Sequence, residues 1–213
     1  QQTNVTIAAT TYVSARWLSS RISRFNEDFP DINIMLQHSV NSSEFKLDDA
    51  DLAILWGPCA GLSDKRRLAE IPMPMFPVIS PQLLASHGIP VDTAFDGINF
   101  LDEPFKNIPL LCEDRQLDTW HEWFESSRPI DIKTNLTNPR RVISDANVRV
   151  QAAIDGQGFI LADDLMLNEI NNGLLVTPFK EKLSGYGYAV YSSSTRIQTD
   201  NALILKDWLV KNS

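Results

Sequence analysis

The chain has 213 residues, of which 43% are hydrophobic and 22% are charged, and this length and composition suit one large globular domain or two smaller lobes. Its formal net charge is −8, and its densest basic clusters, Lys65-Arg66-Arg67 and Arg140-Arg141, are too short to neutralise several phosphates. No apolar run approaches the roughly 18 residues of a membrane span, and the polar start lacks the order of a signal peptide. Composition therefore argues against nucleic-acid binding and membrane insertion by this chain.

The first half predicts a parallel βαβ unit. Residues 5–9 are apolar and β-branched, which is typical of a buried strand. An amphipathic helix follows and ends at Pro30, because one face carries apolar residues three and four positions apart, namely Leu18, Ile22, Phe25 and Phe29. Further strands are expected at 33–37 and 50–55, the latter ending at Trp56-Gly57-Pro58. Strands that alternate with a helix favour a parallel sheet.

A second α/β run follows an extended segment with four prolines at 71–81, which cannot be a central strand throughout. Strands are expected at 110–112, 142–143, 158–162 and 186–191, and helices at 119–126, 147–155, 163–171 and 199–211. The sequence thus predicts an α/β fold of two Rossmann-like lobes with a central cleft.

Signatures of catalysis and metal binding are missing, so we expect no enzyme, no cofactor and no metal site. Gly156-Gln157-Gly158 precedes a strand, which fits a helix stop better than a phosphate-binding turn. The three histidines, His38, His87 and His121, are scattered and are interpreted as structural. Cys59 and Cys112 have no metal-ligand spacing and are expected to be free, buried thiols of a reducing cytoplasm, although a disulfide remains open.

Polar residues gather where predicted strands lead into predicted helices. Thr10, Thr11, Tyr12 and Ser14 follow the first strand, Ser144 to Asn147 follow a later one, and Asp163 begins a helix. Such residues cap helices, and the same positions offer hydroxyls and carboxylates to a ligand, so both interpretations stand. Acid pairs at 48–49 and 163–164 are ordinary loop and capping acids. Trp56 stands at a strand end, where open α/β sheets bind ligands.

The order of these motifs resembles the effector-binding domain of LysR-type transcription regulators, in the branch of the glycine-cleavage activator and the β-lactamase regulator. The resemblance covers nearly the whole chain and is carried by residues 5–10, Ala15-Arg16-Trp17-Leu18, Phe29-Pro30-Asp31-Ile32, Asp51-Leu52-Ala53-Ile54, Phe76-Pro77-Val78-Ile79-Ser80-Pro81, Gln151-Ala152-Ala153 and Asp207-Trp208-Leu209. Two departures stand out. Leu55 replaces the family's usual arginine, and Gly187 separates Tyr186 from Tyr188 where adjacent aromatics are common.

The resemblance implies a type 2 periplasmic-binding-protein-like fold, with lobe I at 1–75 plus 192–213 and lobe II at 76–191, that flexes at crossovers around 76–80 and 188–192. It implies a cytoplasmic, non-enzymatic domain that binds an unknown small-molecule effector between its lobes, forms a homodimer or homotetramer through helices 15–28 and 199–211, and reaches promoter DNA only through an N-terminal helix-turn-helix domain absent from this chain. The implied effector-binding residues, together with the strand-end residues above, are Thr10, Thr11, Tyr12, Trp56, Gly57, Ser80, Ser144, Asp145, Asn147, Asp163, Tyr186 and Tyr188. The alternative is a free-standing extracytoplasmic solute-binding protein of the same fold.

Overall fold

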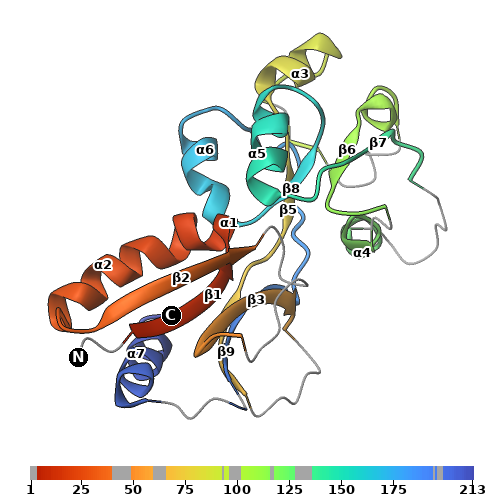
Figure 1. Cartoon of the computed structure of the whole chain (residues 1–213). Coiled ribbons are helices and arrows are strands. Elements are labelled where there is room, and N and C mark those ends of the chain that lie inside the picture. The colour runs from red at the N-terminus through yellow and green to blue at the C-terminus, as the bar shows by residue number, and fades with distance from the viewer. Residues whose placement is uncertain are drawn as a thin grey trace. The chain divides into compact units, whose positions relative to one another are not determined.

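The computed structural model describes residues 4–39, 49–59, 66–92, 94–95, 102–115, 118–127, 136–193, 195 and 199–213. The chain divides into two compact units (Figure 1). Unit 1 consists of Gln1–Met73 and Gly185–Ser213, and unit 2 consists of Pro74–Ser184. Lys65 and Asp48, which belong to a basic cluster and an acid pair of the sequence, lie outside the described residues.

Unit 1 is built on a five-stranded sheet in the order β2-β1-β3-β9-β4. The strands are β1 (Asn4–Thr10), β2 (Asn33–Ser39), β3 (Leu52–Pro58), β4 (Arg67–Pro72) and β9 (Tyr186–Ser192). The strands β1, β2 and β3 pair in parallel, as the βαβ pattern predicts. In contrast, β9 runs antiparallel to β3 and β4, so the sheet is mixed.

One long helical run connects β1 to β2. It comprises α1 (Thr11–Val13), a π-helical turn η1 (Ser14–Leu18) and α2 (Ser19–Asp28), and Figure 1 shows α2 alongside β1 and β2. The C-terminal helix α7 (Asp200–Lys211) packs against this run. The ring of Phe25 meets that of Trp208 at a centroid distance of 5.6 Å, and Trp208 Nε1 donates to Asp28 Oδ2 at 2.9 Å.

Unit 2 is built from short elements around an aromatic core. Its helices are α3 (Pro81–Ser86), η4 (Phe105–Asn107), α4 (Asp118–Ser126), α5 (Ala146–Ile154), η5 (Asp164–Met166) and α6 (Leu167–Asn171), and its strands are β5 (Phe76–Val78), β6 (Leu110–Cys112), β7 (Arg140–Val142) and β8 (Ile160–Ala162). β5 pairs antiparallel with β8, and β6 pairs in parallel with β7. Trp120, Trp123 and Phe124 of α4 are almost completely buried, which confirms that this helix packs through its aromatic residues.

The structure differs from the sequence expectations at three places. The strand at 186–191 forms, but it pairs with β3 and β4 and therefore belongs to unit 1 rather than to the second lobe. The strand β4 and the helix α3 were not expected, because charged residues interrupt the apolar pattern of β4 and the six residues of α3 are too few to show a helical period. Residues 76–78 of the first expected crossover, 76–80, and all of the second, 188–192, lie within strands. The chain passes between the units at Met73–Pro74 and at Ser184–Gly185.

Candidate functional site

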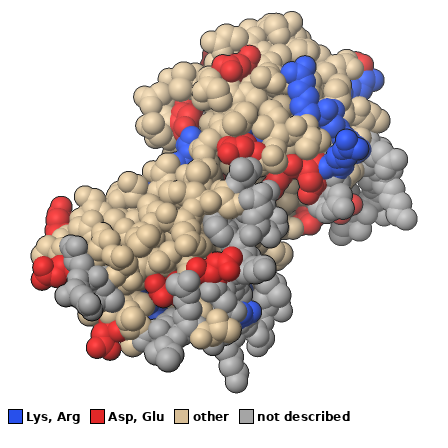
Figure 2. All heavy atoms as spheres, in the orientation of Figure 1, with Lys and Arg blue, Asp and Glu red and all other residues tan. Residues whose placement is uncertain are grey.

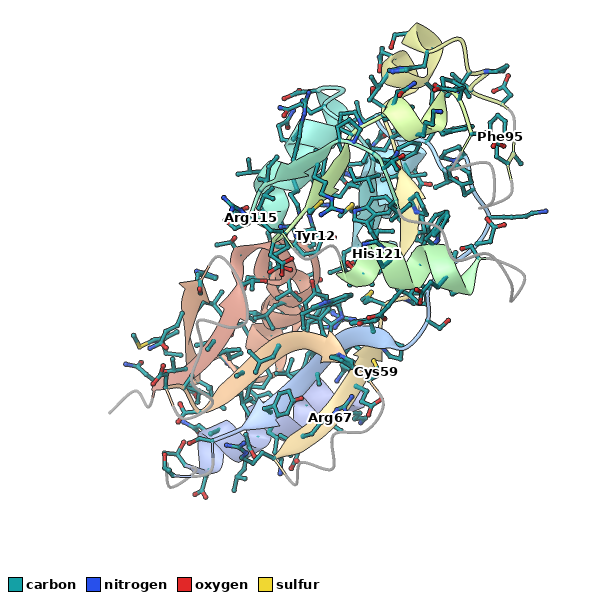
Figure 3. All side chains as sticks on the ribbon, turned by 90° about the vertical axis from the view of Figure 1, so that its right-hand side faces the viewer. Tyr12, Cys59, Arg67, Phe95, Arg115 and His121 are labelled. Carbon is teal, nitrogen blue, oxygen red and sulfur yellow. The ribbon has the colours of Figure 1, made fainter. Side chains whose placement is uncertain are left out.

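The start of the long helix in unit 1 carries the first group of expected site residues. Thr10 Oγ1 accepts a hydrogen bond from the backbone N–H of Val13 at 3.5 Å, so Thr10 is the N-cap. Thr11 is exposed, whereas Tyr12 is buried, and the Arg16 guanidinium lies 5.0 Å from the centre of its ring; Figure 3 labels Tyr12. Thr10 thus caps the helix, as one of the two interpretations predicts, and the exposed hydroxyl of the first turn belongs to Thr11.

A cluster of three aromatic rings forms the second group. Trp56 lies within β3 and pairs directly with Tyr188 of β9, and Pro58 pairs with Tyr186. Because alternate residues of a strand share a face of the sheet, Trp56, Tyr186 and Tyr188 all lie on one face. The ring of Trp56 is 6.0 Å from that of Tyr186 and 5.0 Å from that of Tyr188, measured between centroids. Both tyrosines therefore lie beside Trp56, and which of them contacts an effector stays open.

The two departures from the family pattern, Leu55 and Gly187, lie on the other face of the β3–β9 pair, and the structure explains both. A Cβ on Gly187 would lie 2.3 Å from the carbonyl oxygen of Ile71, so glycine is the residue that lets β4 and β9 approach. The opposite residue in β3, Gly57, has no such neighbour within 4 Å. Leu55 packs against Ala8, Ala50 and Ala53, and replacing an arginine there extends a small apolar cluster.

The expected site residues of unit 2 are chiefly helix caps. Ser80 accepts a hydrogen bond from the Leu83 N–H, and Asp163 accepts one from the Leu165 N–H. Asp145 Oδ1 accepts from the N–H groups of Asn147 at 2.8 Å and of Val148 at 3.1 Å. The remaining two expected residues, Ser144 and Asn147, are exposed and half-buried, respectively.

Sequence reasoning missed Arg149, which positions the loop before α5. Its Nη1 donates to the carbonyl oxygens of Ile143 and Ser144, each at 2.7 Å. A guanidinium fixes two carbonyls because it presents several donors in one plane. The sequence signal was an arginine four residues after the capping aspartate, a spacing that returns a side chain to the first turn of the helix.

The cysteines are free and lie in different units, Cys59 in unit 1 and Cys112 in unit 2. Burial raises the pKa of Cys112 to about 11, and its thiol donates to the Leu110 carbonyl oxygen. Burial also raises the pKa of the half-buried Cys59, with Glu70 adding to the rise, and the nearby Arg67 donates to the Cys59 carbonyl oxygen at 3.0 Å (Figure 3). Both thiols therefore stay protonated near neutral pH.

Two further searches concern only the part of the chain that the structure describes. Among these residues no three histidine, cysteine, aspartate or glutamate side chains group as metal ligands would. None of the helices among them has the length and apolar character needed to cross a membrane. On the face drawn in Figure 2, most of the visible lysines and arginines gather in one strip at the upper right, with aspartates and glutamates beside it.

A family model described as the LysR substrate binding domain matches residues 1–213. Among curated relatives, the glycine cleavage system transcriptional activator of Escherichia coli K12 is 27% identical over 97% of this chain, and the transcriptional activator of a carbapenem-hydrolysing β-lactamase from Serratia marcescens is 26% identical over 98%. The chain spans 64% of the length of the first of these relatives and 67% of the second.

Solved structures with the same fold include the effector domain of the regulator AmpR of Pseudomonas aeruginosa, with a TM-score of 0.78 at 20% identity, covering 100% of this chain and 95% of that one. The regulatory domain of CrgA from Neisseria meningitidis has a TM-score of 0.71 at 19% identity, covering 100% of this chain and 99% of that one. These likenesses confirm the α/β, type 2 periplasmic-binding-protein-like fold class.

Proposed function

Since the chain belongs to the LysR substrate-binding-domain family, we propose that it is the ligand-sensing domain of a LysR-type transcription regulator. The observation that carries the proposal is the family match over the whole chain, 1–213. The matched relatives are named as transcriptional activators, which favours a regulator over a free-standing solute-binding protein. It also favours sensing over catalysis.

The ligand of this proposal is a small-molecule effector bound by strand-end residues of each unit. In unit 1 these are Thr11 with its neighbours Thr10 and Tyr12, and the ring cluster with Gly57. In unit 2 they are Ser80, Asp163 and the Ser144–Asn147 loop. Helix N-termini support the assignment, because their amides and dipoles favour carbonyl groups of a ligand. The carboxylates of Asp145 and Asp163 at two of these helix starts argue against a strongly anionic ligand. That one effector contacts both units stays a prediction.

Contact with promoter DNA belongs, in this proposal, to a helix-turn-helix segment outside this chain. The net charge of −8 supports that assignment. A cytoplasmic location follows from the same role, since a promoter-bound regulator works beside the chromosome.

Assembly into a homodimer or homotetramer is also proposed, through the helices of residues 15–28 and 199–211. A supporting feature is the pair of exposed apolar side chains Leu203 and Val210 of α7, which are seven residues apart and therefore lie on one side of the helix. Sedimentation that detects only monomer at high protein concentration would exclude this mode of assembly for the domain.

Screening metabolites by thermal shift tests the sensing function directly. We expect at least one metabolite to raise the melting temperature, and Thr11→Val to weaken its binding about threefold to tenfold, the value of one lost hydrogen bond. Ser19→Ala is the control, because it removes an exposed hydroxyl further along the same helical run. A screen without a hit contradicts sensing, and equal affinities of the three proteins contradict the role of Thr11.

A further inference from the structure

We propose that the ring cluster of Trp56, Tyr186 and Tyr188 is a stacking subsite and that the effector carries a flat, aromatic ring. The inference rests on the proposed function, since it names the chemistry of the ligand that the same domain senses. Its basis is the geometry of three rings on one face of the β3–β9 ladder.

The three rings define two different orientations. Trp56 and Tyr186 are nearly parallel, with 18° between their planes, whereas Trp56 and Tyr188 are inclined at 64°. Flat rings attract each other in offset-stacked and in edge-to-face arrangements, and each adds free energy beyond the area that it buries. A flat ring placed here can stack on one ring and meet another edge-on. A puckered, saturated ring of equal size has no π-face and gains only from burial.

Burial separates a floor from a contact surface within the cluster. Tyr188 is only 5% exposed, while Trp56 and Tyr186 are half-buried. Tyr188 is therefore the buried base of the cluster, and Trp56 and Tyr186 keep partly exposed side-chain surface that a ligand can cover. Covering such surface is favourable by about 25 cal/mol per Å² of apolar area.

The backbone holds the rings in place before any ligand binds. Trp56 and Tyr188 are direct partners in the ladder, and β9 is held on its other side by β4. Gly187 makes that second pairing possible, because a Cβ would meet the Ile71 carbonyl oxygen at 2.3 Å. A site on paired strands loses little entropy when a ligand binds, so the cluster can discriminate ring shape sharply.

The cluster offers ring faces and two phenolic hydroxyls, and its three side chains carry no charge at neutral pH. Recognition by this subsite therefore depends on the shape of the ring and not on the charge of the group attached to it. This feature fixes the choice of probes, which must pair a flat with a saturated ring for several different attached groups.

The test measures three probe pairs against the domain by NMR titration: benzoate with cyclohexanecarboxylate, benzamide with cyclohexanecarboxamide, and benzylamine with cyclohexylmethylamine. We expect the flat member of at least one pair to bind about threefold to tenfold more tightly. It should also shift the indole N–H signal of Trp56, assigned with Trp56→Phe, through the ring current that a saturated ring lacks. Equal affinities within each pair, or no binding by any probe, overturn the proposal.

Variants locate the effect. Trp56→Leu removes the flat-ring preference, whereas Trp56→Phe keeps at least part of it. Tyr191→Leu is the matched control and keeps the full preference, because Tyr191 lies on the same strand with an odd spacing from Tyr188 and so on the opposite face. A preference that survives Trp56→Leu overturns the proposal. The signal shift in the unmodified domain remains decisive if that variant fails to fold.

The two proposals fail separately. A domain that binds a metabolite through Thr11 but treats flat and saturated probes alike is a sensor without a stacking subsite. A domain for which neither the metabolites nor the probes bind contradicts both the sensing function and the subsite.

Discussion

The two units reach a similar α/β design by different means. Unit 1 has a continuous sheet, and two of its strands come from opposite ends of the chain and carry the ring cluster between them. Unit 2 has strands of three residues, and its interior is filled by tryptophan and phenylalanine rings. Unit 2 also holds 16 acidic against nine basic residues, compared with 11 against ten in unit 1.

This difference shows where each unit derives its specificity. In unit 1 the three aromatic rings depend on register, because a slip of one residue would move Trp56 to the other face of the sheet, whereas Thr10 is placed by a local helix cap. In unit 2 the site residues depend on short-range hydrogen bonds at helix starts. Long-range strand pairing thus positions the ring cluster of unit 1, and local capping positions the site residues of unit 2.

Raising the pH should lower the stability of unit 2 through the buried thiol of Cys112. Cys112 keeps its proton up to a pKa of about 11, from an ordinary value of 9.0, so between these pH values the unfolded chain releases a proton that the folded chain retains. The free energy of unfolding therefore falls as pH rises through this window, by at most about 3 kcal/mol. Urea unfolding of the unmodified chain and of Cys112→Ala at pH 8 and pH 11 measures the difference.

Cys59→Ala is the comparison in unit 1, where the thiol is half-buried and its contribution to the pH dependence should be smaller. If both variants change the pH dependence equally, the distinction between the two interiors is wrong.

Adding a methyl group should affect stability differently at Gly187 and at Gly57, the two glycines that pair between β9 and β3. Gly187→Ala must push the Ile71 carbonyl away and should cost about 1–3 kcal/mol of unfolding free energy. Gly57→Ala adds its Cβ to open space and should change stability by at most about 0.5 kcal/mol. Thermal and urea unfolding check both, and equal losses would refute the close approach of β4 to β9.

Removing helix caps should lower the free energy of unfolding by the smallest amount of the three changes. The loss should be larger for the cap in unit 2 than for the cap in unit 1. Asp145→Ala loses a carboxylate that accepts two backbone hydrogen bonds and should cost about 1 kcal/mol. Thr10→Ala loses a single bond of 3.5 Å and should cost about 0.5 kcal/mol. A larger loss for Thr10→Ala in urea unfolding would show that capping matters more in unit 1.

Most helices and parallel strands were predictable because their signals are local. Periodicity, caps and the stop at Gly156 lie within a few residues of each other. The pairing of β9 with β3 was not predictable, because its partners are more than a hundred residues apart and no local pattern encodes their register. The π-helical turn at Ser14–Leu18 also has no reliable sequence signal.

The capping residues of the candidate site were predictable for the same local reason, but capping alone does not mark a site. Thr199 Oγ1 accepts from the Ala202 N–H at 3.2 Å at a helix start that no sequence argument assigned to ligand binding. The joint position of Trp56, Tyr186 and Tyr188 required the register of two distant strands. The need for glycine at position 187 arises from the close approach of a third strand, β4, which is also distant in the sequence.

The strand β9 completes the sheet of unit 1 but comes late in the chain. During synthesis, therefore, all residues of unit 2 are made before unit 1 is complete. Residues 74–184 form an uninterrupted segment and can fold as they emerge. The strand β3 waits with an open edge until residues 186–192 have left the exit tunnel. Nascent chains that stop before that point present the unpaired backbone N–H and C=O groups of this edge to chaperones and to one another.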